Sequence, residues 1–358
     1  MFKRAHMTAL LLAVLLSFSC LWAGQKPTEL TENCTTRECH NSYRQKRYVH
    51  KPVALGVCKL CHKSVDPKKH SFKLVRTRKE LCGNCHQEQT GDLSTIPSIA
   101  QLRAKAPRVG KTRYLHKPLE EGKCIDCHNA HSSDYKFLLT AAKVAEACRK
   151  CHDKNEIAKN AHEPFAKGEC NLCHDSHGSN YRYLLIKNQR QLCFSCHEDT
   201  KAELGRYTYV HKPVVDRGCT VCHGPHVSDY FRLLVKEYTP EFYAPFDISN
   251  YDLCFSCHRA DKVLAKETEN FTDFRNGKMN LHYLHVNSPE RGRTCRACHA
   301  THASNEPKHL RKAVPYGGWE IPMQFKKTGT GGGCSPGCHN PRAYDRVQPV
   351  IYVSDKNF

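Results

Sequence analysis

Cysteine pairs closed by a histidine recur eleven times in this chain of 358 residues and use all but one of its 23 cysteines. Two pairs are long: Cys34 and Cys39 precede His40, and Cys334 and Cys338 precede His339. The other nine have the spacing Cys-x-x-Cys-His and are Cys58–Cys61–His62, Cys82–Cys85–His86, Cys124–Cys127–His128, Cys148–Cys151–His152, Cys170–Cys173–His174, Cys193–Cys196–His197, Cys219–Cys222–His223, Cys254–Cys257–His258 and Cys295–Cys298–His299.

The histidine after each second cysteine points to c-type haem. The two thiols form thioethers with the haem vinyl groups, and the adjacent imidazole binds the iron. Zinc sites and disulfides are the alternatives. A structural zinc site needs paired Cys-x-x-Cys elements that make four ligands, and neither alternative requires a histidine after every pair. The sequence therefore predicts eleven covalently attached haem c groups.

A conventional side-chain core cannot hold this chain together. Only about a fifth of the residues are Leu, Ile, Val or Phe, and 25% are charged. Such a composition is typical of disordered chains, because ordering each residue's backbone costs roughly 1–2 kcal/mol. We therefore expect a haem-cored fold that depends on haem attachment. It should be mostly irregular, with short α-helices such as 141–151 and little or no β-sheet.

Histidine supplies nearly all candidates for the second axial ligand. Outside the N-terminal leader the chain has only two methionines, Met279 and Met323. Outside the same leader, twelve histidines do not follow a cysteine pair: His50, His70, His116, His131, His162, His177, His211, His226, His282, His285, His302 and His309. Twelve candidates for eleven positions favour bis-histidine ligation throughout. Low potentials are expected, because an axial methionine would raise them.

Internal repeats organise the spare histidines. The segment 124–139 closely resembles 170–185 and 219–234, and a histidine lies eight residues before the first cysteine in four places. The predicted organisation is a single-haem segment and five dihaem units: 24–46, 47–113, 114–159, 160–208, 209–281 and 282–358. The fourth unit contains an insertion at 238–249, which we expect to be a solvated loop; a contact surface for a partner is the alternative.

Two places depart from the repeat. The histidine after the motif is displaced to His70 in the first unit, and His282 and His285 compete as leading histidine of the fifth. The five units account for ten spare histidines, two for each unit. The remaining two, from His282, His285 and His309, should include the ligand of the first haem. The sequence does not determine which histidine meets which iron.

Residues 1–23 are typical of a secretory signal. Lys3 and Arg4 precede the apolar run 10–16, which is too short to span a membrane. Lipid modification of Cys20, the remaining cysteine, is an alternative. We expect export to the periplasm or the outer surface. The net charge of +20 would be offset by haem propionates, so a nucleic-acid partner is not expected.

The repeated order of leading histidine, motif, second histidine, Ser, Tyr, Leu-Leu and second motif resembles the doubled-CXXCH multihaem c-type cytochromes of metal- and sulfate-respiring bacteria. The resemblance covers residues 34–339. It implies electron transfer through a linear array of bis-histidine haems, in respiration or to extracellular acceptors. It also implies redox partners such as other cytochromes, a membrane quinol oxidase or an outer-membrane porin conduit.

Two other functions stay open at this point. A multihaem reductase for nitrite, hydroxylamine or a similar oxyanion would need an open iron position, as catalytic metal sites generally do. The spare histidines suffice to close every site, so we expect an electron carrier and not an enzyme. A subunit of a conductive homopolymer is the second alternative, with the first haem capped by a histidine of the next subunit.

Overall fold

The computed structural model describes residue 34 and residues 40–86, 114–152 and 158–352. The chain divides into two compact parts. The N-terminal part comprises 1–96 with 117–142, and the C-terminal part comprises 97–116 with 143–358. The proposed boundaries of the five dihaem units stay a prediction.

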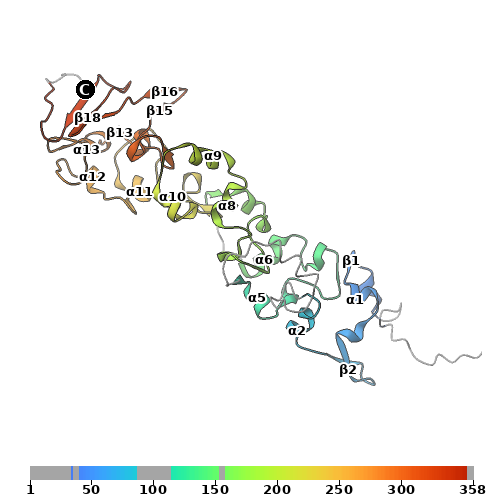
Figure 1. The fold of residues 1–358 in the computed structure, drawn as a ribbon. Helices are drawn as coiled ribbons and strands as arrows, with labels where there is room; N and C mark the ends of the chain where they lie inside the picture. The colour runs from blue at the N-terminus through green and yellow to red at the C-terminus, as the bar shows by residue number, and fades with distance from the viewer. Residues whose placement is uncertain (1–33, 35–39, 87–113, 153–157, 353–358) are drawn as a thin grey trace, which may run out of the picture. The chain divides into compact units, whose positions relative to one another are not determined.

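Short helices and strands joined by long irregular segments make up both parts (Figure 1). The N-terminal part contains η1 Asn41–Arg44, β1 Tyr48–Val49, α1 Lys51–Ala54, η2 Cys58–Leu60, β2 His62–Asp66, β3 Ser71–Leu74, α2 Arg78–Gly83, α5 Lys117–Glu120, η3 Cys124–Asp126, β5 Ser132–Ser133 and η4 Lys136–Leu138.

The C-terminal part is longer. Its first half contains β4 Tyr114–Leu115, α6 Val144–His152, β6 Asn160–Ala161, α7 Glu163–Ala166, η5 Cys170–Leu172, β7 Gly178–Ser179, η6 Arg182–Leu184, α8 Gln189–Phe194, α9 Glu198–Arg206, β8 Tyr209–Val210, α10 Lys212–Asp216, η7 Cys219–Val221, β9 Val227–Ser228 and η8 Phe231–Leu233. Its second half contains β10 Tyr243–Ala244, η9 Ile248–Tyr251, α11 Asp252–Phe255, α12 Asp261–Leu264, β11 Arg275–Asn276, β12 Met279–Asn280, α13 Leu281–Val286, β13 Gly292–Arg293, α14 Cys295–Cys298, β14 Ala303–Ser304, η10 Pro307–His309, β15 Ala313–Tyr316, β16 Trp319–Pro322, β17 Lys326–Lys327, β18 Gly331–Cys334 and β19 Arg342–Asp345.

A short helix follows the leading histidine in several units. His50, His162 and His211 are extended N-cap residues, and a proline occupies the first turn of α1, α7 and α10. Proline suits this position because the first turn of a helix needs no N–H donor there. The His-x-Pro sequence thus ends the strand at the histidine and begins the helix directly after it.

The helices that carry the second motifs agree with the sequence prediction. The helix expected over 141–151 is α6, which begins three residues later. In α2, Thr77 accepts from the backbone N–H of Glu80, and the Glu80 carboxylate accepts from the Thr77 N–H. This capping box satisfies two backbone donors at the helix start.

Antiparallel strand pairs are more numerous than predicted. Four of them join the strand before a leading histidine to the strand after the first motif of the next unit: β1–β5, β4–β7, β6–β9 and β8–β14. A three-stranded sheet, β17–β18–β19, follows near the C-terminus. The fold is therefore mixed and irregular, and the expectation of little or no sheet was too strong.

Side-chain packing is sparse outside one region of the C-terminal part. Tyr251, Val263 and Val286 are buried together there, against Phe246 and Phe255. Elsewhere many large apolar side chains are exposed. Within the described residues, no helix has the length and apolar character needed to cross a membrane.

Candidate haem-binding sites

Motif histidines lie opposite spare histidines, with their ring centroids about 6 Å apart. In the N-terminal part the ring centroids are 5.8 to 5.9 Å apart in the pairs His40–His70, His50–His86 and His62–His131. In the C-terminal part they are 6.0 to 6.4 Å apart in the pairs His116–His152, His162–His197, His174–His226, His211–His258, His223–His302 and His282–His299.

These separations leave room for one iron atom between two imidazoles. A metal–imidazole bond is about 2 Å long and a ring centre lies roughly 1 Å behind its nitrogen, so ligands on opposite sides of one iron have ring centres about 6 Å apart. The residues present therefore fit haem c. No group of three or more His, Cys, Asp or Glu in the described part of the chain could hold a metal ion.

The pairs follow one rule along the repeats. The leading histidine of a unit faces the second motif of the same unit, as His162 faces His197. The histidine three residues after a first motif faces the first motif of the preceding unit, as His226 faces His174. Neighbouring units thus each supply one histidine to the same pair. His128 and His177 fall in different parts of the chain, and the second ligand at that motif stays a prediction.

The displaced histidine of the first unit lies opposite the histidine of the first motif. The rings of His40 and His70 have centroids 5.8 Å apart. The sequence drew candidates for this ligand from His282, His285 and His309, and the geometry adds His70 as the candidate. His70 follows the same rule as the histidines of later units, because it faces the motif that precedes its own unit.

The fifth unit uses two leading histidines, both on α13. His282 faces His299. His285 lies close enough to His339 for that charge to help lower the pKa of His285, although burial is the larger cause. The sequence left His282 and His285 as competitors, and the structure places the ring of His282 opposite that of His299.

His309 faces no motif histidine among the described residues. Its ring meets the His211 ring edge-on, with centroids 5.3 Å apart and an interplanar angle of 68°. Its Nδ1 is buried without a hydrogen-bond partner in the described structure. Burial also lowers its pKa. It stands where other units have leucine, such as Leu184, and is the surplus spare histidine.

Backbone carbonyls hold the outer nitrogen of many rings. The Nδ1 atoms of His128, His174, His223 and His299 lie 2.8 to 3.0 Å from the carbonyl oxygens of Phe137, Tyr183, Arg232 and Lys308. Those of His50, His116 and His162 lie 2.9 to 3.0 Å from the carbonyl oxygens of Ala130, Ser176 and Pro225. An Nδ1–H that donates to a carbonyl leaves Nε2 free to bind a metal.

His282 has a hydroxyl partner in place of a carbonyl. Its Nδ1 lies 3.0 Å from Thr272 Oγ1. Burial, with a smaller contribution from His299, lowers the pKa of His282 to about 3. The ring is therefore neutral, which is the form that binds iron.

Thiols of successive motifs meet at the junctions between units. A hydrogen bond between Cys193 and Cys219 is the largest cause of a raised pKa at Cys193 and of a pKa lowered to about 6 at Cys219. Cys254 and Cys295 share the same kind of contact. Thioethers formed at these thiols would place the edges of neighbouring haems together.

A left-handed glycine lies at the junction between the second and third units. Gly168, with φ +72°, precedes Cys170 by two residues, and a Cβ built on it would lie 2.6 Å from the Cβ of Ala145 in α6. The helix of one unit can therefore pack directly against the turn that begins the next motif.

Four segments of the chain, residues 50–91, 116–157, 162–202 and 211–263, match the family model for the doubled CXXCH motif. Each match begins at a leading histidine and includes both motifs of one unit. The chain belongs to the doubled-CXXCH multihaem c-type cytochromes. A comparison with curated protein sequences finds no match.

The insertion of this multihaem cytochrome packs in part against the fifth unit, and residues 247–249 stay exposed. Tyr238 and Ala244 are each 7% exposed. β10 pairs with β13 of the fifth unit, and Thr294 donates its hydroxyl to the carbonyl of Glu241 at 2.6 Å. The insertion folds back onto the Cys295 motif because its aromatic side chains supply a local apolar core there.

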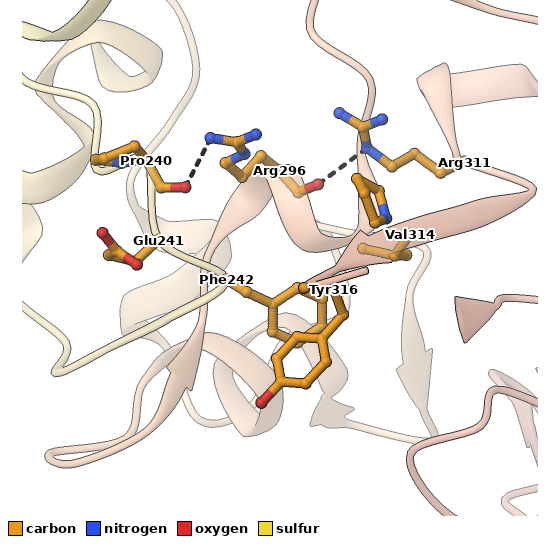
Figure 2. A pocket seen from close by; sticks show the side chains of 9 residues that line it. Pro240, Glu241, Phe242, Arg296, Arg311, Val314 and Tyr316 are labelled. Carbon is orange, nitrogen blue, oxygen red and sulfur yellow. Dashed lines mark hydrogen bonds between the residues drawn. The ribbon is translucent and has the colours of Figure 1, made fainter. Parts of the chain in front are cut away.

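A cavity of about 270 Å³ lies behind this motif (Figure 2). Arg296, between the two cysteines, donates to the carbonyl of Pro240 at 2.6 Å, and Arg311 donates to the carbonyl of Arg296 at 3.0 Å. Phe242 and Tyr316 pack edge to face beside them, with centroids 5.2 Å apart. These contacts fix the Cys-x-x-Cys loop against the insertion and β15.

Sequence reasoning missed the carbonyl partners of the ring nitrogens. The repeated Tyr and Leu-Leu residues marked the place, but their side chains carry no metal chemistry. The functional group there is the backbone, and a sequence pattern does not show that a carbonyl faces a ring.

Proposed function

We propose that this multihaem cytochrome carries eleven haem c groups and transfers electrons along them. The facing histidine pairs carry the proposal, because a spare histidine opposes a motif histidine at iron-spanning distance in both parts of the chain. When bound, each haem would supply an iron that gains and loses one electron. The chain's own role is to hold both axial positions closed and to bring successive motifs into contact.

Closed axial positions favour a carrier over an oxyanion reductase. A reductase needs one iron with an exchangeable position. The described histidines supply an opposing ring to nine motif histidines, and His285 lies near His339 as the candidate for another. Two rings fixed by hydrogen bonds on Nδ1 also limit the rearrangement that accompanies a change of iron charge, which favours rapid electron transfer.

The pairing at His40 favours a discrete carrier over a filament. In the polymer hypothesis the first haem needs a histidine from the next subunit. His70 of the same chain already lies opposite His40, so the first haem would be complete without a second copy. We propose an exported carrier that exchanges electrons with other redox proteins, in the periplasm or at the outer surface.

Intact mass with an absorption spectrum tests the haem count. The secreted protein should carry eleven haems on a chain that lacks about its first 23 residues. A variant with Cys34→Ser and Cys39→Ser should carry ten, and a variant with Cys334→Ser and Cys338→Ser should also carry ten. A wild-type count of nine, unchanged in both variants, would contradict the proposal for the long motifs.

Electron paramagnetic resonance of the oxidised protein tests the carrier role. Low-spin ferric signals should account for the iron, and nitrite or cyanide should leave them unchanged. A stoichiometric high-spin signal that responds to either ligand would instead favour the reductase.

A further inference from the structure

Within the described residues, four backbone corners have two consecutive residues with left-handed φ and no glycine. They are Phe137–Leu138, Tyr183–Leu184, Arg232–Leu233 and Lys308–His309, with φ between +52° and +60°. Residues other than glycine rarely adopt this conformation, and then usually singly. We call these pairs the double corners. Strain that recurs in four repeats indicates that the backbone there does something a relaxed turn would not.

Each double corner directs successive carbonyls at one motif. In the third unit the Tyr183 carbonyl accepts from His174 Nδ1 at 2.8 Å, and the Leu184 carbonyl accepts from the N–H of Asp175 at 2.8 Å. Ile186 donates its N–H to the carbonyl of Cys173 at 3.0 Å. Residues 173–175 are thus all hydrogen-bonded to the short segment 183–186.

The same contacts recur at the other three corners. The carbonyls of Leu138, Leu233 and His309 accept from the N–H groups of Asn129, Gly224 and Ala300 at 2.6 to 2.8 Å. The first unit differs, because the hairpin β2–β3 replaces the corner and pairs His62 with Leu74. The double corner therefore accompanies the first motifs of four units.

We propose that the double corner is a positioning element that orients the motif histidine and increases its electron donation to iron. A carbonyl that accepts the Nδ1–H gives the imidazole more negative character, which stabilises Fe(III) and lowers the reduction potential. The inference rests on the proposed function, since it assigns a role toward the haem bound at these motifs.

Tyr183 allows a test that separates the backbone from the side chain. Its side chain is 75% exposed, so substitutions there change few packing contacts. Tyr183→Gly keeps the left-handed conformation accessible, whereas Tyr183→Val disfavours it because the residue is β-branched. Both variants lose the same contact with Arg182, whose guanidinium lies 5.6 Å from the Tyr183 ring centroid.

Redox titration and electron paramagnetic resonance of the full-length holoprotein give the readout. Tyr183→Val should shift one haem in eleven to a higher potential and change one low-spin signal, and Tyr183→Gly should match the wild type in both. A purely structural corner would lower thermal stability in the valine variant without moving any potential, and that result would overturn the proposal. Absence of low-spin haem from all three proteins would instead overturn the proposed function.

Discussion

His302 and His309 are seven residues apart, are both partly exposed, and differ in what they face. His302 lies opposite His223, with ring centroids 6.1 Å apart, whereas His309 lies edge-on to His211. We predict that His302→Ala opens one axial position, because no other described histidine ring faces His223. About one eleventh of the iron should then become high-spin and bind cyanide, as measured by electron paramagnetic resonance.

His309→Leu is the matched control for that prediction. It restores the leucine found at this place in three other double corners, and it removes a buried Nδ1 without a described partner. All iron should stay low-spin, and the free energy of unfolding should be unchanged or higher, because an unsatisfied buried polar group costs about 1–3 kcal/mol. High-spin iron in this variant would show that His309 is a ligand.

The sequence predicts a set of candidate ligand residues, but it does not predict which of their rings lie opposite one another. The spacing Cys-x-x-Cys-His identifies the motif residues, and counting identifies the spare histidines. The partner of His174 is His226, 52 residues later and in the next unit. No local pattern encodes such a contact, because it depends on how one repeat stacks on the next. Counting alone therefore pointed to His282, His285 or His309 for the first motif, whereas the described geometry places the ring of His70 beside that of His40.

Among the elements, the contact between α6 and η5 depends on a glycine. We predict that Gly168→Ala lowers the free energy of unfolding by about 1–3 kcal/mol, because its Cβ would overlap Ala145 and its φ is +72°. A Cβ added at Gly205, inside α9, would meet no atom within 4 Å. Gly205→Ala should raise stability by about 0.5–1 kcal/mol. Equal effects of the two changes in thermal unfolding would refute this account.

The sheet β17–β18–β19 should lose stability in acid. Asp345 accepts from Thr330 Oγ1 and from the N–H groups of Val347 and Gln348 at 2.8 and 2.9 Å. The Thr330 hydrogen bond is the largest cause of its lowered pKa. A carboxyl group whose pKa is lower in the folded than in the unfolded chain stabilises the fold at pH values above its unfolded pKa. This stabilisation is lost as the pH falls through the folded-state pKa.

Asp345→Asn should therefore flatten the dependence of the unfolding temperature on pH below about 4. Thr330→Val should weaken the same dependence, since it removes the largest cause of the shift. Variants that follow the wild-type acid profile would exclude Asp345 as the group responsible.

Helices were easier to predict than strands. The residues of α6 favour helix and end at a motif, so its existence followed from propensity. The paired strands are mostly two residues long, such as β6 with β9, and a strand of two residues has no alternation to recognise. These pairs exist because stacking of repeats brings two extended segments together at each leading histidine.

At the scale of the molecule, two kinds of core hold different regions. Around Tyr251, Val263 and Val286 the side chains themselves form a small apolar core. Elsewhere the described chain exposes large apolar groups such as Leu55, Leu60 and Leu172, at 64%, 63% and 55%. The low content of Leu, Ile, Val and Phe predicted this shortage of buried apolar side chains. The local core near the fifth unit was not predicted, because it depends on the insertion folding back.

The last prediction follows from this difference between regions. Without haem attachment, most of the chain should be unfolded, because the histidine pairs alone cannot offset the backbone entropy. Hydrogen exchange of protein made without the attachment machinery should show little protection in residues 114–152 and residual protection around η9, α12 and α13. The holoprotein, as control, should protect both regions. Protection of 114–152 in the haem-free chain would mean that side chains stabilise the fold there. Folding of that region would then not depend on haem attachment.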